Sequence, residues 1–344
     1  MPRKSIVAGM AGVAALALSA GVAGCGASAD SSGPVLKIGY FQGAVAGPEA
    51  VVAANPDLAS HVKSTIQLRP IDSGVAGMAQ LRAGAFPVVS AVGNPPFVGA
   101  FASGTDVEAV FVESIDESGL VVDDAIRSNA DLKKVGVLVG STLDFQLRGW
   151  LSSQKLTDRV QVASFASEAA EAAAWKSGKI DSVYISQAYL LDLKKHGGRV
   201  LTTATDVARL GYAAVNLLAV DKAYAKRNPA VIQQLVCQVA KAQTLVKGPQ
   251  AAKYVTPASR FLGVKAADAI AATGDYPYVP QAEETGWLQG PDGTAASGKL
   301  AKNFQLTGQF LVTQGRAKSV PSIDLIAAHI DPTFWAKTRS GGCA

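Results

Sequence analysis

Short strand-like segments rich in apolar residues recur along this chain, and most of them are followed by a segment with helical periodicity. In the first third the strand-like segments are 35–40, 66–71, 86–92 and 107–113. Helices are predicted after Pro48 and over 74–83. Parallel strands need crossover connections, which helices supply. The alternation therefore predicts an α/β fold built on parallel strands and argues against a β-sandwich.

The pattern breaks over 123–132 and then restarts, which predicts a second lobe. Its predicted strands are 134–139, 160–165, 182–185 and 199–202, and its predicted helices are 142–151, 168–175 and 189–196. After a strand at 213–220 the chain is mainly helical, over 229–247, 258–262, 266–272 and 298–314. We therefore expect a discontinuous first lobe (35–118 and 213–330), a second lobe (119–212) and a C-terminal tail (331–344).

The N-terminal segment is typical of an export signal. Arg3 and Lys4 precede an apolar stretch over 6–20 that is too short for a confident membrane span. Val22-Ala23-Gly24-Cys25 resembles a bacterial lipobox, which predicts a signal peptide over 1–24 and acylation of Cys25. Residues 25–34 are small and polar, and we expect a flexible tether. An uncleaved anchor helix or simple secretion with a free Cys25 are the alternatives, and both place the protein outside the cytoplasm.

Charge and cysteine content exclude several classes of function. The formal net charge is +5 without any basic run, so no nucleic-acid partner is predicted. The three histidines are far apart and lack acidic or cysteine neighbours at ligand spacing, so no metal or other cofactor is predicted. Cys237 falls in an apolar helical segment and Cys343 in a Gly-rich tail, and we do not expect them to form a disulfide.

An ordered set of short motifs spans the region from Leu36 to Gln314. The motifs are Ile38-Gly-Tyr-Phe-Gln, Ile71-Asp-Ser-Gly, Leu81-Arg-Ala-Gly, Gly93-Asn-Pro-Pro, Glu113-Ser-Ile-Asp-Glu-Ser-Gly-Leu-Val-Val, Gly140-Ser-Thr, Ala174-Trp-Lys-Ser-Gly-Lys-Ile-Asp and Tyr278-Val-Pro-Gln-Ala-Glu-Glu-Thr-Gly. Together they resemble the taurine, aliphatic sulfonate and nitrate branch of the solute-binding proteins of ATP-driven (ABC) importers, with the taurine-binding subfamily most similar.

This resemblance implies a two-lobe periplasmic-binding-protein clamshell of type II, with crossover strands near 118–121 and 211–216. A small solute such as taurine or another organosulfonate would be held between the lobes, and closure would create the surface that the permease reads. The implied protein is a monomeric, lipid-anchored lipoprotein on the extracytoplasmic face of the membrane. Its implied partners are an ABC permease and the ATPase of that transporter.

An anionic ligand group needs convergent N–H and O–H donors, which helix N-termini supply. The loop containing Phe41 and Gln42 enters the helix at Pro48, and Ser141 and Thr142 enter the helix that follows them. These two hydroxyls are also good helix caps. Asn94 lies in 93–96, which we interpret either as a ligand-binding loop at a strand end or as a rigid turn.

A ligand ammonium group needs carboxylates. Glu113, Asp116 and Glu117 lie beside the first crossover, where they are either ligand contacts or solvated surface charges. At the second crossover the chain has Asn216 where the resemblance leads us to expect an acid, and an amide carries no charge.

Two further residues of the second lobe are candidates for ligand contact. Tyr184 would line the cleft, whereas Trp175 is expected in the core. A faint echo of helix, glycine and strand between the two lobes places Gln187 in the loop that faces 93–96.

Enzymes with a similar fold provide the main competing class. A desulfinase needs a nucleophilic cysteine in the cleft, but Cys237 is predicted to be buried on a helix. A pyrimidine-precursor synthase needs a His/Cys-rich site, which this sequence lacks. We therefore expect a protein that is not an enzyme. A sensory or scaffold lipoprotein and a transporter of a nitrate-like anion, an amine or an amino acid stay open.

Overall fold

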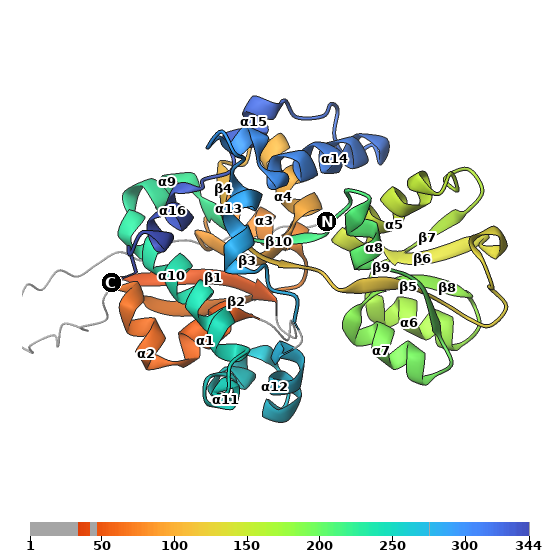
Figure 1. Ribbon diagram of the computed structural model, residues 1–344, viewed down its shortest axis with the longest axis horizontal. Helices are drawn as coiled ribbons and strands as arrows, with labels where there is room; N and C mark the ends of the chain where they lie inside the picture. Colours follow the sequence, from red (N-terminus) through yellow and green to blue (C-terminus); the bar gives the residue numbers. More distant parts are fainter. Residues whose placement is uncertain (1–33, 42–46, 275, 344) are drawn as a thin grey trace, which may run out of the picture. The chain divides into compact units, whose positions relative to one another are not determined.

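The computed structural model describes residues 34–41, 47–274 and 276–343. These residues form two five-stranded sheets, each covered by helices (Figure 1). The predicted signal peptide, the predicted acylation site Cys25, nearly all of the predicted tether and Gln42 lie outside the described residues. Within the described ranges, the helices are all too short or too polar to cross a membrane.

The first sheet has the strand order β2-β1-β3-β10-β4. Its strands are β1 (Val35–Phe41), β2 (Thr65–Ile71), β3 (Val88–Gly93), β4 (Val107–Ile115) and β10 (Val215–Asp221). Strand β1 is parallel to β2 and β3, whereas β10 is antiparallel to β3 and β4. We call this sheet and the helices on it lobe I.

The second sheet has the strand order β7-β6-β8-β5-β9, and with its helices it forms lobe II. Its strands are β5 (Ser118–Val122), β6 (Lys134–Leu138), β7 (Gln161–Phe165), β8 (Ser182–Ser186) and β9 (Arg199–Thr203). Strand β6 is parallel to β7 and β8, and β5 is antiparallel to β8 and β9. Each sheet is therefore mixed, because the strand that enters it from the other lobe runs against its neighbours.

The chain crosses between the lobes twice. It leaves β4 at Ile115 and enters β5 at Ser118, so only Asp116 and Glu117 connect the two sheets there. It returns from β9 through α8 (Ala204–Arg209) to β10. The predicted two-lobe α/β fold with two crossover strands is confirmed.

The helices follow the predicted order, with several additions. Lobe II has α5 (Thr142–Ser153), α6 (Glu168–Lys176), α7 (Gln187–Lys195) and α8. Lobe I has α1 (Pro48–Ala54), α2 (Pro56–Ala59), α3 (Gly74–Arg82), α4 (Asn94–Ala102), α9 (Lys222–Arg227), α10 (Pro229–Val246), α11 (Ala251–Leu262), α12 (Ala266–Gly274), α13 (Gln281–Leu288), α14 (Lys299–Thr313), α15 (Ile323–Ala327) and α16 (Thr333–Arg339).

Residues 93–96 are not the tight loop that the sequence suggested. Gly93 ends β3, and Asn94 and Pro95 begin α4. Proline is tolerated in the first helical turn because its missing N–H would have no partner there. The loop interpretation of this motif was therefore wrong.

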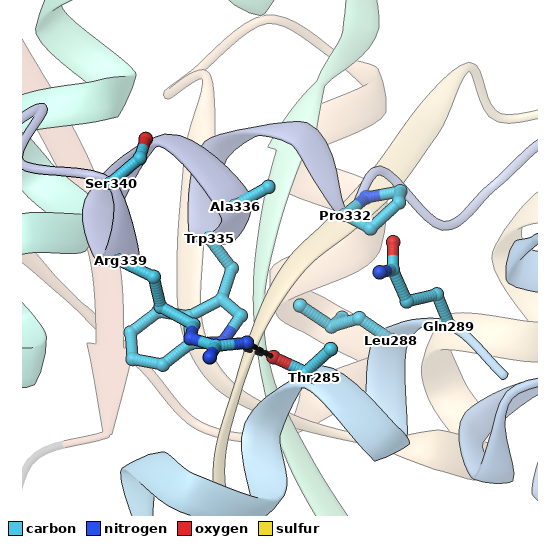
Figure 2. A pocket seen from close by; sticks show the side chains of 8 residues that line it. All are labelled: Thr285, Leu288, Gln289, Pro332, Trp335, Ala336, Arg339 and Ser340. Atoms are coloured by element: carbon cyan, nitrogen blue, oxygen red, sulfur yellow. Dashed lines mark hydrogen bonds between the residues drawn. The ribbon is translucent and has the colours of Figure 1, made fainter. Parts of the chain in front are cut away.

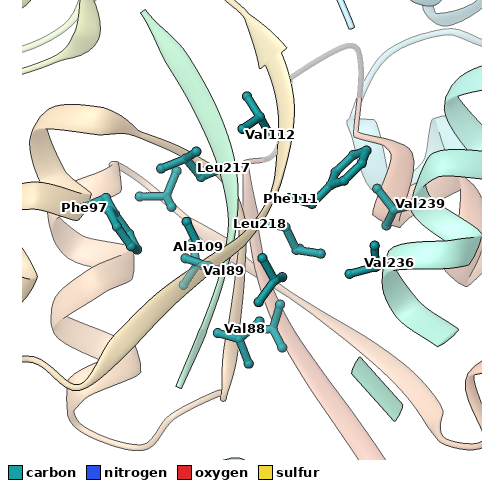
Figure 3. Close-up of a cluster of buried hydrophobic side chains, with 14 of the residues drawn as sticks. Val88, Val89, Phe97, Ala109, Phe111, Val112, Leu217, Leu218, Val236 and Val239 are labelled. Carbon is teal, nitrogen blue, oxygen red and sulfur yellow. The ribbon is translucent and has the colours of Figure 1, made fainter. Parts of the chain in front are cut away.

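The core of lobe I lies on both faces of its sheet. Figure 3 shows Phe97 of α4 on one side of the strands and Val236 and Val239 of α10 on the other. The β3 residues Val88 and Val89 are fully buried between these two layers. Burying a side chain of this kind stabilises the fold by about 1.5–3 kcal/mol. A sheet covered on both faces explains why its strands have continuous apolar runs.

The C-terminal segment is part of lobe I. Helix α16 packs on α10 and β4, with the rings of Trp335 and Phe111 5.5 Å apart. Gly341 adopts a φ of 94°, and the chain turns back so that the Gly342 N–H donates to the Lys337 carbonyl at 2.8 Å. Cys343 forms a disulfide with Cys237 of α10. Our expectation that these cysteines stay unpaired was wrong, because the Gly-rich segment makes a turn that returns Cys343 to α10.

Candidate ligand-binding site

Asp116 connects three elements where the chain crosses between the lobes. Its carboxylate accepts a hydrogen bond from Thr142 Oγ1 of α5 at 2.8 Å and a second one from Asn216 Nδ2 of β10. The Asp116 N–H donates to the Ala214 carbonyl at 2.8 Å. Burial raises the pKa of Asp116, although the bonds from Thr142 and Asn216 act in the opposite direction. One carboxylate thus ties lobe II to both crossovers.

The N-terminus of α5 is capped by the chain itself. Ser141 Oγ accepts from the N–H groups of Leu143 at 3.1 Å and Asp144 at 3.3 Å, and it donates to the Leu138 carbonyl. The Gly140 N–H donates to Asp144 Oδ2 at 2.8 Å. Ser141 therefore has the capping role that we considered, while the Thr142 hydroxyl is directed at the crossover.

A second group joins an acid of α1 and an acid of β4 through Ser90 of β3. Ser90 Oγ is 2.8 Å from Glu49 Oε2 and 2.8 Å from Glu113 Oε1. A hydroxyl has one proton and can donate to only one carboxylate, so the other carboxyl group must be protonated and donate to Ser90 Oγ. Glu113 also accepts from the Ala91 N–H at 2.6 Å, and Ala91 has the unusual φ of 55°.

The protonation of this pair agrees with its surroundings. Glu49 is 1% exposed and Glu113 is 2% exposed. Burial raises the pKa of Glu49, and burial together with the charge of Glu49 raises the pKa of Glu113 to about 8. The Glu49–Ser90–Glu113 group thus holds a proton near neutral pH.

Two tyrosines that the sequence did not single out lie beside these acids. The rings of Tyr276 and Tyr278 are 5.1 Å apart, and Ser114 donates to the Tyr276 hydroxyl at 3.3 Å. Burial, and then the negative charge of Asp116, raise the pKa of Tyr276. The only local sequence signal for these two tyrosines is the Tyr276-Pro-Tyr278 spacing. Their position beside the acids depends on the tertiary fold.

Lobe II contributes buried donors beneath α5. Ser118 Oγ donates to Gln146 Oε1 at 2.8 Å. The Gln146 amide nitrogen is buried and makes no hydrogen bond to any residue in the described ranges, and the buried Tyr184 hydroxyl lies beside Ser118. Gln146 lies one turn after Thr142 on the same face of α5. The polar side chains of Thr142, Gln146 and Ser118 therefore extend from the crossover into lobe II.

Two of the remaining predicted residues, Asn94 and Gln187, form hydrogen bonds with neighbours of this junction. Asn94 is fully buried in lobe I, where it donates to Thr307 Oγ1 at 2.8 Å and accepts from the Val215 N–H at 3.4 Å. Gln187 is exposed at the start of α7, and its N–H donates to the Glu117 carbonyl at 2.9 Å. Phe41 is half-buried at the end of β1. The structure thus brings Thr142 and Asn216 into contact with Asp116. It also joins Glu113 to Glu49, a residue that the sequence did not indicate.

A separate pocket of about 300 Å³ lies on lobe I between α13 and α16 (Figure 2). Trp335 Nε1 and Arg339 Nη1 both donate to Thr285 Oγ1, at 3.1 and 2.9 Å. None of the residues lining this pocket was predicted from the sequence to contact a ligand. Among the residues that the structure describes, no group of three or more His, Cys, Asp or Glu could hold a metal ion.

Comparisons with known proteins agree on one family. The model of the NMT1-like family matches residues 30–258, about two-thirds of the chain. The taurine-binding periplasmic protein of Escherichia coli K12 is 25% identical over 286 residues, which are 79% of this chain and 85% of that protein.

Two solved structures have the same fold. The periplasmic aliphatic sulphonate-binding protein SsuA of E. coli has a TM-score of 0.68 at 23% identity, over 89% of this chain and 98% of that one. The desulfurization enzyme DSZB has a TM-score of 0.58 at 17% identity, over 89% of this chain and 99% of that one. The fold is thus found in both binding proteins and an enzyme, and the family model that spans most of the two lobes shows that this chain belongs to the NMT1-like family.

Proposed function

We propose that this protein is the extracytoplasmic substrate-binding lipoprotein of an ABC importer, and that it binds taurine or a related small organosulfonate between its lobes. The Asp116 junction is the observation on which the proposal rests. There one half-buried carboxylate contacts both crossovers and lobe II, with further acids on one side and buried donors on the other. The taurine-binding relative supports the choice of ligand.

The charges at the junction favour a ligand with a cationic end. Asp116 places a carboxyl group at the crossover, and the Glu49–Ser90–Glu113 group places two more on lobe I. A buried carboxylate is stabilised by an ammonium group at close range, whereas an inorganic anion such as nitrate is repelled. An amine or a small amino acid is therefore the second candidate.

Lobe II offers donors for the opposite end of such a ligand. The Gln146 amide nitrogen has donor capacity that the described residues do not use, and the Tyr184 hydroxyl is buried close to it beside Ser118. A sulfonate has three acceptor oxygens, and a buried donor without an acceptor is costly. The proposed site keeps four of the residues predicted from the sequence, which are Glu113, Thr142, Tyr184 and Asn216. It also includes Glu49 and Asp116. Asn94 acts through its bonds to Thr307 and Val215, which support the crossover.

The disulfide supports two further parts of the proposal. Cys237 is bonded to Cys343, so it does not supply the free nucleophilic thiol of a desulfinase, and we propose that the protein is not an enzyme. Structural disulfides persist mainly in oxidising compartments, which agrees with export. Acylation of Cys25 would anchor the protein beside its permease and ATPase, and loss of membrane association in Cys25→Ser would check this.

Thermal unfolding of the purified soluble part, residues 31–344, tests the proposed ligand class. We expect stabilisation by taurine or an alkanesulfonate, of about 2.7 kcal/mol at a concentration one hundred times the Kd. Nitrate, glycine betaine and amino acids are the comparison ligands. If only an amine or amino acid stabilises the protein, the second candidate replaces the first, and if none of these solutes does, the proposal fails.

A further inference from the structure

The two lobes touch closely where β3 ends and α5 begins. A Cβ atom placed on Gly93 of lobe I would lie 2.6 Å from Thr142 Cγ2 of lobe II, a separation that real Cβ atoms do not reach. Gly93 has a φ of −69° and a ψ of 157°, which any residue adopts. Glycine is therefore needed at this position because of the approach of Thr142, and not because of the backbone conformation.

Thr142 cannot easily turn its methyl group away. Its hydroxyl donates to Asp116 Oδ2 at 2.8 Å, and both branches are carried by the same Cβ atom. Rotation about χ1 would move the hydroxyl and the methyl group together, and the bond to the Asp116 carboxylate would be lost. A side chain on Gly93 would therefore push the lobes apart, since the threonine is held in place.

The same contact continues along α5. Phe145 is fully buried and packs on Phe310 of α14, with ring centroids 5.6 Å apart. The guanidinium group of Arg316, which follows α14, lies so close to Gly140 that a Cβ atom there would be 1.7 Å from Arg316 Nη1. Helix α5 is thus an element of lobe II that rests on lobe I.

We propose that Gly93, Thr142 and Asp116 form a latch that sets the closest approach of the two lobes. The absent side chain of Gly93 admits the Thr142 methyl group, and Asp116 holds the hydroxyl. Gly93 and Thr142 are thus positioning residues, because a ligand contacted by both lobes binds best when the lobes reach this distance. The expected effect of the latch on ligand binding rests on the proposed function, whereas its expected effect on lobe separation does not.

A double-mutant cycle isolates this contact. Apart from Thr142 Cγ2, the nearest atoms to a Cβ on Gly93 are Asn216 Oδ1 and Pro95 Cδ, both at 3.9 Å. Thr142→Ser removes the methyl group and retains the hydroxyl, so it removes the clash. We expect Gly93→Ala to weaken taurine binding by about tenfold in the Thr142 protein and by less than about twofold in the Thr142→Ser background.

Lobe separation is measured without ligand by spin labels on Val75→Cys in α3 and Leu191→Cys in α7, which replace exposed side chains of the two lobes. Gly93→Ala should lengthen the distance between the labels, and the double variant should restore it. The matched control is Gly99→Ala in α4, where a Cβ would meet only Leu311 Cδ1 at 3.8 Å, and it should change neither quantity.

Two results would overturn the latch. One is an unchanged label distance in Gly93→Ala when circular dichroism shows that the variant is folded. The other is an equal effect of Gly93→Ala in both backgrounds, since the cause would then be something other than the methyl contact. If taurine fails to bind even the unaltered protein, the proposed function fails, and the label distances still decide whether the latch exists.

Discussion

At the residue scale, the proton held between Glu49 and Glu113 has the clearest consequence. The position of Ser90 between both carboxyl groups requires it on geometry alone. The sequence indicated Glu113 from its place beside the crossover but not Glu49, which lies on helix α1, 64 positions earlier (113 − 49). Nothing in a local pattern shows that two such distant acids share one hydroxyl.

The shared proton makes stability depend on pH in a defined direction. The pKa of Glu113 rises from an ordinary value of 4.5 to about 8 in the folded protein. Between these values the folded state keeps a proton that the unfolded state releases, so stability falls as pH rises from about 5 to 8, by up to about 1.4 kcal/mol per pH unit for one proton. Urea unfolding of Glu113→Gln should show a shallower decline over this range.

Other buried acids contribute to the same decline, so the informative quantity is the difference in slope between variants. Glu283→Gln, which alters an exposed carboxyl on α13, is the matched control and should keep the original slope. An identical slope in the protein with Glu113 and in Glu113→Gln would contradict the shared proton.

At the element scale, the sequence predicted most strands within about two residues, because apolar alternation and Gly or Pro stops are local signals. It missed α4 because Pro95 and Pro96 resemble a turn, although proline also fits the first turn of a helix. It treated both sheets as parallel because strand direction depends on where the chain returns from the other lobe, which no local pattern records.

The position of α16 also depends on a distant partner, Cys237 on α10. The disulfide joins residues separated by 106 positions, so its loss should free a large loop in the unfolded chain. We expect Cys343→Ser to lower the free energy of unfolding by about 2–5 kcal/mol. Urea unfolding with and without a reductant measures this, and the reductant should destabilise only the protein with both cysteines. Equal stability of the two proteins would contradict a structural role for the bond.

At the scale of the whole molecule, the ordered motifs predicted the two-lobe fold with its crossovers, and the family model supports the same assignment. The site was harder to predict, because it is assembled from strand ends and helix starts of both lobes. Thr142 and Asn216 were chosen for their types and positions, but their common partner Asp116 is visible only in the fold. The fold alone does not determine the ligand, because both binding proteins and an enzyme have this architecture.

Calorimetric titration of residues 31–344 with taurine measures the proposed ligand binding directly. We expect saturable binding with one taurine per chain, and weaker binding of ethanesulfonate, which lacks the ammonium group that the buried acids would stabilise. Absence of saturable binding for both compounds, in protein that unfolds cooperatively, would contradict the assignment as a sulfonate-binding protein.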